Sequence, residues 1–377
     1  MKETKDVIQH IRAEANDYYS NDDLFSISSW GADLSFRELI DRYRDDELVK
    51  PELQRKYVWD KTEASRFIDS ILLGLPVPSI FLAKTKDEKM LIIDGYQRIM
   101  TVYDFVVGIF SPDGKVFRLS RSEKINTRWK GKAFSELTDA EQRKIKNTTI
   151  HAIIFVQDHP SKDNTSLYQI FERINTSGIT LLPQEIRNCV YQGSLNRLLL
   201  ALNKHSNWRV LFGLEQEDAR MRDVEFILRF FALSSDKFHK EKKEGISLKK
   251  FLNDFMRENL NPSEDDIEFL KLRFCRTIDF LSNTFGQVVF HNLSTTDPDR
   301  LVTKFNPTIF DSIMIATDYA ITKSSEITTL KPIEATRRSL LSNKKYREAL
   351  SKETMRTVSI RTRISIACNT LFNLTYE

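Results

Sequence analysis

The order of hydrophobic and polar positions divides the chain near residue 190. Before this point, short hydrophobic stretches typical of strands are mixed with helical patterns. Beyond Pro183 nearly all hydrophobic residues recur at helical spacing, as in 220–233, 248–260, 265–285, 309–321 and 360–372. This pattern predicts an α+β fold, with a mixed domain over residues 1–190 followed by an all-helical domain over residues 191–377.

Helix starts in the first half carry capping residues. Ser35 and Asp60 each precede a helical pattern and are followed three positions later by Glu, which is the capping-box arrangement. Thr138 is a third predicted cap. Gly74 ends the helix that follows Asp60, because glycine adopts the left-handed C-terminal conformation without strain. Further helices are predicted over 96–110 and 166–176.

Hydrophobic runs bounded by turn residues predict the strands. Residues 80–84 and 89–93 form a predicted hairpin around a charged turn, and 150–157 is predicted as a single strand. A second hairpin is predicted across 116–134. Residues 49–59 are expected to be extended.

Residues 90–100 hold the most informative local pattern. A hydrophobic strand runs into Asp94 and Gly95, and a helix that opens with Gln97 and Arg98 follows with almost no loop. The free N–H groups and the positive dipole end of such a helix favour an anion. The junction therefore predicts a phosphate site. An ordinary turn with Asp94 as the helix N-cap explains the same residues equally well.

Two further blocks, 53–59 and 171–178 (the latter followed by 185–188), are also rich in polar residues. A nucleoside triphosphate site needs forked cationic donors for phosphate oxygens. Four arginines can supply them: Arg55, Arg98, Arg173 and Arg187. Such a site also needs Mg²⁺ held by a carboxylate, for which Asp94 is the best candidate. Gln97 or Gln54 can orient the attacking water.

Each block also has an interpretation without chemistry. Residues 54–55 can lie on an exposed strand edge, while Tyr57 and Trp59 are expected as half-buried packing. The segment 175–178 can be a helix C-terminus. Residues 187–188 can lie on a solvated helix face. No single block therefore decides the function.

Composition narrows the possible classes of protein and partner but does not identify a function. The chain has 377 residues, a formal net charge of +4 and a pI of about 8.7, mildly basic values that are compatible with a nucleotide or nucleic-acid partner. Its three cysteines are widely separated, as expected of reduced thiols. With no signal-like start or membrane-length hydrophobic run, we expect a cytoplasmic protein. There is no P-loop motif, and the His residues form no metal-binding pattern.

Taken in order, the three blocks resemble the N-terminal-domain family of GmrSD-type modification-dependent restriction endonucleases, the domain of unknown function 262. That family has an early Q-R-x-Y-V-W, a central D-G-Q-Q-R, and a later F-x-x-I-N-x-x-G with E-I-R-N nearby. The corresponding segments here are 54–59, 94–98, 171–178 and 185–188. The order and spacing of the motifs carry the resemblance, which covers about residues 24–192.

The resemblance implies a ParB/sulfiredoxin-like fold that binds and hydrolyses nucleoside triphosphates to control attack on foreign or modified DNA. It implies catalytic roles for Asp94, Gln97 and Arg98. Asp94 is also the expected ligand of Mg²⁺. Together with the donor argument above, it assigns nucleotide contacts to a wider set: Gln54, Arg55, Gly95, Tyr96, Arg173, Asn175, Arg187 and Asn188. Tyr96 stands where the family usually has Gln. It either stacks on a base or ribose, or leaves nucleotide binding intact while hydrolysis weakens.

Many relatives carry a C-terminal HNH nuclease domain, and residues 190–377 hold no recognisable one. Such a domain has a His-x-x-Pro strand and a following Asn, whereas His205, His239 and His291 lie in no such pattern. We therefore expect an NTP-hydrolysing regulatory subunit of a prokaryotic restriction or anti-phage system, in which DNA cutting either belongs to a separate nuclease chain or does not occur.

The alternative is a non-enzymatic DNA-recognition or protein-interaction module whose helical half, 191–377, is the docking or DNA-contacting surface. It predicts steeply salt-dependent DNA affinity without nucleotide. A nuclease acting alone is disfavoured, because no cluster of ligands for two metal ions is visible. The nucleotide base, the modification sensed and a homo-oligomeric state are left open.

Overall fold

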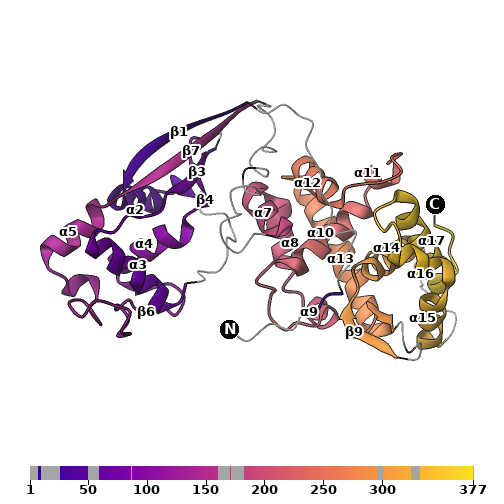
Figure 1. The fold of residues 1–377 in the computed structure, drawn as a ribbon. Coiled ribbons are helices and arrows are strands. Elements are labelled where there is room, and N and C mark those ends of the chain that lie inside the picture. Colours follow the sequence, from indigo (N-terminus) through magenta and orange to yellow (C-terminus); the bar gives the residue numbers. More distant parts are fainter. Residues whose placement is uncertain are drawn as a thin grey trace. The chain divides into compact units, whose positions relative to one another are not determined.

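The computed structural model describes residues 7–9, 26–49, 59–85, 87–159, 170, 182–294, 297, 300–323 and 332–376. The chain forms two compact units, residues 22–190 and residues 191–377 together with 1–21. Figure 1 shows a sheet with helices in the first unit and mainly helices in the second. The mixture confirms the predicted α+β class. The predicted domain limits, 1–190 and 191–377, stay predictions.

A five-stranded mixed sheet forms the centre of the first unit. In spatial order its strands are β1 (Ser26–Ser35), β7 (Thr149–His159), β3 (Ile80–Lys84), β4 (Met90–Asp94) and β2 (Leu48–Val49). β3 and β4 pair antiparallel, which confirms the first predicted hairpin. β7 contains the predicted strand 150–157 and pairs parallel with β3. β2 is parallel to β4 and lies at the sheet edge.

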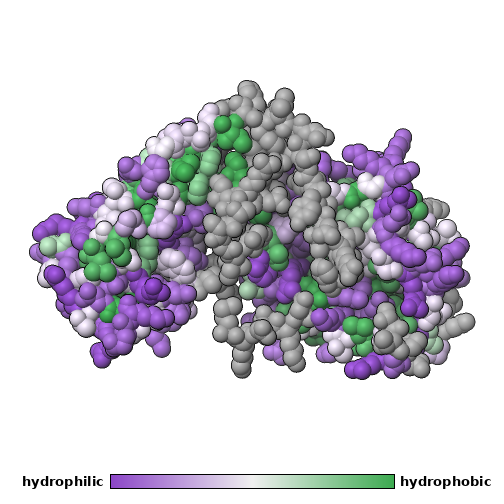
Figure 2. Space-filling model, viewed as in Figure 1, coloured by the Kyte–Doolittle hydropathy of each residue, from purple (hydrophilic) through white to green (hydrophobic). Residues whose placement is uncertain are grey.

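Strand β1 is a feature that the hydrophobic pattern does not predict. Its sequence contains Gly31 and Asp33, residue types that are depleted in strands. β1 forms because it pairs antiparallel with β7 along its length, and because the missing side chain of Gly31 makes room for His151, whose ring would lie 2.7 Å from a Cβ there. On the outer surface Trp30 is 43% exposed, and Figure 2 shows hydrophobic residues over the β1–β7 pair.

The predicted helix caps of the first unit are confirmed. Ser35 caps α2 (Phe36–Arg44) by accepting the N–H of Glu38, although its reciprocal bond is not formed. Asp60 and Thr138 form full capping boxes at α3 (Lys61–Leu73) and α5 (Asp139–Asn147). Gly74 ends α3 in the left-handed conformation, with φ 82°. α2, α3, α5 and α4 (Tyr96–Val107) share one hydrophobic core with the sheet, and α7 (Pro183–Val190) follows later in the chain.

Two predictions around α4 are wrong. The helix ends at Val107 rather than residue 110, because Gly108 at φ 94° terminates it and the short strand β5 (Ile109–Phe110) follows. β5 pairs with β6 (Lys115–Val116), so the hairpin lies before residue 117 instead of across 116–134. Residues 117–133 form turns with one isolated bridge, and η1 (Phe134–Glu136) leads into α5. Aromatic residues in this segment face the core rather than a partner strand.

Within its described residues, the second unit is helical apart from one small sheet. Its helices are α8 (Ser194–Leu202), α9 (Ser206–Phe212), α10 (Arg222–Leu233), α11 (Asp236–His239), α12 (Leu248–Glu258), α13 (Glu264–Phe285), α14 (Pro307–Lys323), α15 (Ile333–Ser342), α16 (Lys344–Ser351) and α17 (Thr357–Phe372). These include all five helices predicted from periodicity. The prediction of an all-helical half is wrong at β8 (His291–Leu293) and β9 (Leu301–Phe305), which pair antiparallel. Ile8 adds a parallel bridge to Phe305, so residues 7–9 belong with this unit.

Aromatic rings and a buried ion group hold the second unit together. Trp208 and Phe310 are fully buried with ring centroids 5.6 Å apart. Beside this aromatic cluster, Asp311 on α14 receives hydrogen bonds from two buried arginines, Arg229 of α10 and Arg363 of α17. A single carboxylate thus joins three helices through charged side chains that have almost no solvent exposure.

Candidate functional site

The connection between β4 and α4 contains a single residue, Gly95. Its φ of 102° lies in the left-handed region that side chains rarely adopt. A Cβ at this position would also stand 2.2 Å from Cγ2 of Ile80 on the neighbouring strand. Backbone conformation and packing therefore both require glycine. The tight turn brings the end of β4 directly to the first turn of α4.

Gly95 is also the N-cap residue of α4, so no cap side chain shields the first turn. The alternative in which Asp94 is the N-cap is wrong. Its carboxylate instead accepts from Arg98 Nη2 at 2.5 Å, one helical turn on. The positive end of the α4 dipole is therefore not neutralised by a capping carboxylate, and an anion is favoured there.

Arg98 connects Asp94 to the segment that precedes β3. Its Nη1 donates to the backbone oxygens of Pro78 and Ser79, each at 2.9 Å. The Arg98 side chain is 14% exposed, whereas that of Asp94 is 42% exposed. The arrangement holds the Asp94 carboxylate in one orientation and leaves part of it open to solvent.

Gln97 links this junction to the end of the first polar block. Its side-chain oxygen accepts the backbone N–H of Trp59 at 3.4 Å, and the Trp59 ring packs on Phe67 with centroids 5.5 Å apart. The half-buried packing expected for Trp59 is therefore confirmed. Gln54 and Arg55 lie outside the described residues, and their nucleotide contacts stay predictions.

Tyr96 contributes to packing at the first position of α4. Its half-buried ring lies against the hydrophobic core of the first unit. Burial, with smaller contributions from Tyr43 and Asp104, raises the pKa of the Tyr96 hydroxyl to about 12. The phenol is therefore uncharged at neutral pH and adds no negative charge that would repel phosphate.

The third polar block is only partly described. Arg173 and Asn175 lie outside the described residues. Arg187 and Asn188 lie on α7 with 1% and 0% exposure, so the alternative of a solvated helix face is wrong. Arg187 Nη1 donates to Gln184 Oε1 at 3.1 Å. Nucleotide contacts of Arg173, Asn175, Arg187 and Asn188 remain predictions.

The described residues do not form a metal site from protein side chains alone. They contain no group of three or more His, Cys, Asp or Glu that could hold an ion. A site built by one carboxylate, water and substrate phosphates would not form such a group. Asp94 therefore stays the predicted Mg²⁺ ligand.

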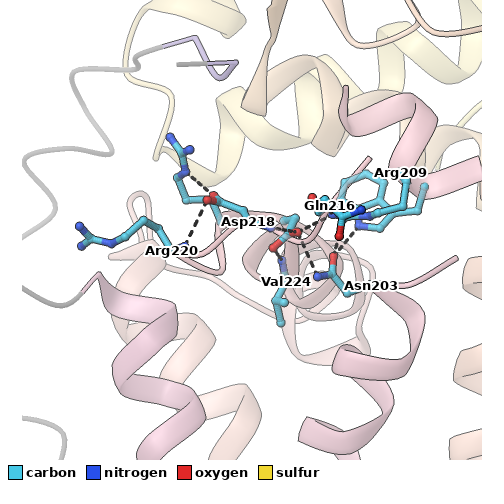
Figure 3. Close-up of polar contacts among 9 residues, drawn as sticks. Asn203, Arg209, Gln216, Asp218, Arg220 and Val224 are labelled. Carbon is cyan, nitrogen blue, oxygen red and sulfur yellow. Dashed lines mark hydrogen bonds and ion pairs between the residues drawn. The ribbon is translucent and has the colours of Figure 1, made fainter. Parts of the chain in front are cut away.

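A second polar centre, which the sequence patterns do not reveal, lies in the second unit. The buried Asp223 carboxylate accepts from Asn203 Nδ2 at 3.0 Å, Arg209 Nη1 at 2.7 Å and the N–H of Asp218 at 2.8 Å (Figure 3). The network fixes the loop before α10, where Met221 has φ 57°. Only the tertiary fold brings these residues together, so no local motif marks them. Both oxygens of Asp223 accept from protein donors, because the N–H of Val224 donates to Oδ1 and the other three groups donate to Oδ2. A buried carboxylate satisfied by the protein in this way is typical of a structural network.

Comparison with known proteins bears on the first unit. Residues 36–192 match the family model described as GmrSD restriction endonuclease, N-terminal domain. This part of the chain belongs to the GmrSD N-terminal domain family. The GmrSD domain runs from α2 to just beyond α7 and contains the whole β4–α4 junction. No curated protein matches the chain.

The family placement suggests a role for the GmrSD domain in a restriction system. Strand β1 precedes the matched region, and the helices of the second unit follow it. None of the helices in the described ranges is long and hydrophobic enough to cross a membrane.

Proposed function

We propose that the chain is a nucleotide-binding, NTP-hydrolysing subunit of a restriction or anti-phage system, and that its β4–α4 junction binds the phosphates. The observation that carries the proposal is the α4 N-terminus, capped only by Gly95, beside the half-exposed Asp94. Backbone N–H groups and the helix dipole attract phosphate oxygens. The family match supports the biological setting.

The donor set at the junction fits a Mg²⁺–nucleotide complex. Mg²⁺ prefers oxygen ligands and commonly combines one or two carboxylates with phosphate oxygens and water. Asp94 offers such a carboxylate, already oriented by Arg98. Bound Mg²⁺ would neutralise phosphate charge, and Gln97 is the proposed group that orients the attacking water.

Arg98 has a distinct part in this proposal. Its Nη1 and Nη2 already donate to two carbonyl oxygens and to Asp94. We therefore assign it to orienting Asp94, while a direct contact with phosphate remains a prediction. If both residues act through the same carboxylate, Asp94→Asn and Arg98→Ala will be non-additive, and the double variant will lose little more activity than either single one.

The test is calorimetry with the four ribonucleoside triphosphates, with and without Mg²⁺, together with assays of phosphate release. We expect binding of at least one nucleotide and Mg²⁺-dependent release that falls about 100-fold or more in Asp94→Asn. Asp87→Asn is the matched control, because Asp87 is an exposed aspartate in the same unit. It should leave release unchanged.

Absence of binding for all four nucleotides would reject the proposal. Binding without release would restrict it to nucleotide sensing, the outcome that the Tyr96 departure also allows. Equal losses in Asp94→Asn and Asp87→Asn would show that the junction has no special role.

We also propose that the first unit has a ParB/sulfiredoxin-like fold. The mixed five-stranded sheet and the helix that starts directly after β4 support it. We further propose action in the cytoplasm beside a separate nuclease chain. Co-expression with candidate nuclease chains, followed by size-exclusion chromatography, tests that association.

A further inference from the structure

Charge is strongly segregated along the first unit. Residues 114–147 contain ten Lys and Arg against four Asp and Glu, a formal net charge of +6. The remainder of residues 22–190 contains fifteen Lys and Arg against twenty-one Asp and Glu, a formal net charge of −6. The unit as a whole is neutral, so the overall charge of the protein conceals this contrast. A local excess of one sign creates a field that attracts an oppositely charged partner.

Most of the positive charges in residues 114–147, here called the basic segment, are exposed. Its exposed Lys and Arg are Lys115, Arg118, Arg121, Lys124, Arg128, Arg143 and Lys144. Figure 2 shows mainly hydrophilic residues over the end of the first unit where Figure 1 labels α5 and β6. The segment also exposes the carboxylates of Glu123, Glu136 and Asp139, so its exposed charge is predominantly positive. An excess of positive charge along one stretch of chain is suited to a polyanion.

Five of these side chains, Lys115, Arg121, Lys124, Arg143 and Lys144, hold no ion pair within the described ranges, and Lys144 Nζ instead donates to the backbone oxygen of Leu72 at 2.7 Å. By contrast, Arg118 pairs with Glu136 at 2.7 Å and Arg128 with Glu141 at 2.9 Å. Even the Arg128 side chain remains 68% exposed. The unpaired cations need not break an ion pair before they bind an external anion.

The basic segment is fixed in place on α3. The Asp69 carboxylate accepts from Trp129 Nε1 and from the N–H of Asn126 at 3.1 Å. The N–H of Ser120 donates to the Ser65 hydroxyl at 2.8 Å. An anchored backbone lowers the conformational entropy that a partner must remove on binding. The turns between residues 117 and 133 are therefore a pre-organised surface.

The aromatic residues of the basic segment are turned inward. Phe117, Trp129 and Phe134 are 0%, 4% and 9% exposed and belong to the hydrophobic core. Single-stranded nucleic acids are usually bound by exposed aromatic rings on which the bases stack. Cations without exposed rings instead suit the phosphate backbone of a duplex, which carries a dense and regular negative charge.

We propose that the basic segment binds the phosphate backbone of double-stranded DNA without sequence preference. This proposal rests on the restriction role proposed above, in which the chain takes part in a system that attacks duplex DNA. It assigns the DNA-contacting surface to the first unit, whereas the alternative drawn from the sequence named residues 191–377 as the docking or DNA-contacting surface. Arg121, Lys124 and Arg143 are the principal contacts.

The experiment measures binding of the full chain to a labelled duplex of about 20 base pairs of mixed sequence, by fluorescence anisotropy between about 50 and 300 mM KCl. For the unmodified protein, log K should fall linearly with log[KCl]. In the triple variant Arg121→Gln, Lys124→Gln, Arg143→Gln, the slope should be shallower by about 2 to 3, and affinity at low salt should fall roughly tenfold or more.

A matched control removes three cations elsewhere in the unit: Arg44→Gln, Lys84→Gln, Lys89→Gln. It should bind DNA as the unmodified protein does, and circular dichroism should show both variants folded. Equal weakening in the two triple variants, tighter binding of single-stranded than double-stranded DNA, or salt-independent binding would each overturn the proposal. So would failure of the unmodified protein to bind.

Nucleotide binding by the same triple variant separates this proposal from the proposed function. Loss of DNA affinity with unchanged calorimetric nucleotide binding supports two distinct sites. If the unmodified protein binds no nucleotide but the basic-segment variant still loses DNA affinity, the proposed function fails and the DNA surface stands.

Discussion

The left-handed conformation of Gly95 and the lack of space around its Cα both follow from the one-residue connection between β4 and α4. Gly108, at the other end of the same helix, has a similar φ of 94° but no atom within 4 Å of a built Cβ. The two glycines therefore separate backbone strain from steric overlap. Only Gly95 faces a neighbouring strand.

We expect Gly95→Ala to cost about 3 kcal/mol of unfolding free energy and Gly108→Ala about 1 kcal/mol, because both introduce left-handed strain and only the former forces Ile80 aside. Urea denaturation of the two variants measures the difference. Equal costs would mean that the contact with Ile80 relaxes freely.

His291 makes the stability of the second unit depend on pH. Burial, reinforced by the nearby Arg337, lowers its pKa below the ordinary value of 6.5. As pH falls below 6.5, the unfolded chain takes up this proton before the folded protein does. The unfolding free energy should therefore decrease as pH falls from 6.5 through the folded-state pKa.

Replacing His291 with Gln tests the direction of this pH dependence of the unfolding free energy. Between about pH 7.5 and about pH 5.5, His291→Gln should lose less unfolding free energy than the unmodified protein, because Gln does not titrate. Urea titrations at the two pH values give the comparison. A larger loss in His291→Gln would contradict the assignment.

Among the elements, α3 does more than cover the sheet, because it anchors the turns of the basic segment. Asp69 faces this segment and is 8% exposed. Its carboxylate accepts from the indole of Trp129, which is 4% exposed, and from the N–H of Asn126. Together with Ser65, which accepts the N–H of Ser120, Asp69 thus holds the segment on a neighbouring helix.

Asp69→Ala should cost about 2 to 3 kcal/mol of unfolding free energy, because it removes the acceptor of the buried Trp129 indole and of the Asn126 N–H. Trp129 fluorescence should shift to longer wavelength as solvent reaches the ring. Asp41→Ala is the control, since Asp41 is exposed on α2 and should have little effect. An unshifted spectrum in folded Asp69→Ala would argue against the anchoring role.

For the molecule as a whole, the carboxylate of Asp311 is a buried charged link between three helices of the second unit. Two arginines with about 2% exposure share it. Removing it would take a buried carboxylate away from two buried guanidinium groups at once. By contrast, the exposed pair between Asp236 and Lys240 lies in water.

We expect Asp311→Ala to cost about 3 to 5 kcal/mol, with faster amide exchange across α10, α14 and α17, whereas Asp236→Ala should be nearly neutral. Hydrogen exchange read by mass spectrometry locates the effect. Exchange in β3, β4 and β7 of the first unit should be unchanged if each unit is held by its own core. Similar costs for the two aspartates would show that the buried group relaxes without penalty.

Features determined by neighbouring residues were predictable from the sequence. Capping at Asp60 and Thr138 depends on residues three positions away, and the helices of the second unit follow from hydrophobic spacing along one segment. The β4–α4 junction is likewise local, so Asp94 to Arg98 come together through chain continuity alone. Here the sequence itself determined the candidate site, although the described residues do not include Gln54, Arg55, Arg173 or Asn175.

Only the tertiary structure decided the features that need distant partners. β1 forms from weak strand residues because β7 supplies its hydrogen bonds across more than a hundred residues. Arg187 and Asn188 were compatible with solvent until packing buried them. The carboxylates of Asp69, Asp223 and Asp311 gained their partners in the same way. Long-range contacts of this kind leave no periodic trace in the sequence, because each depends on where the fold places a side chain rather than on its neighbours along the chain.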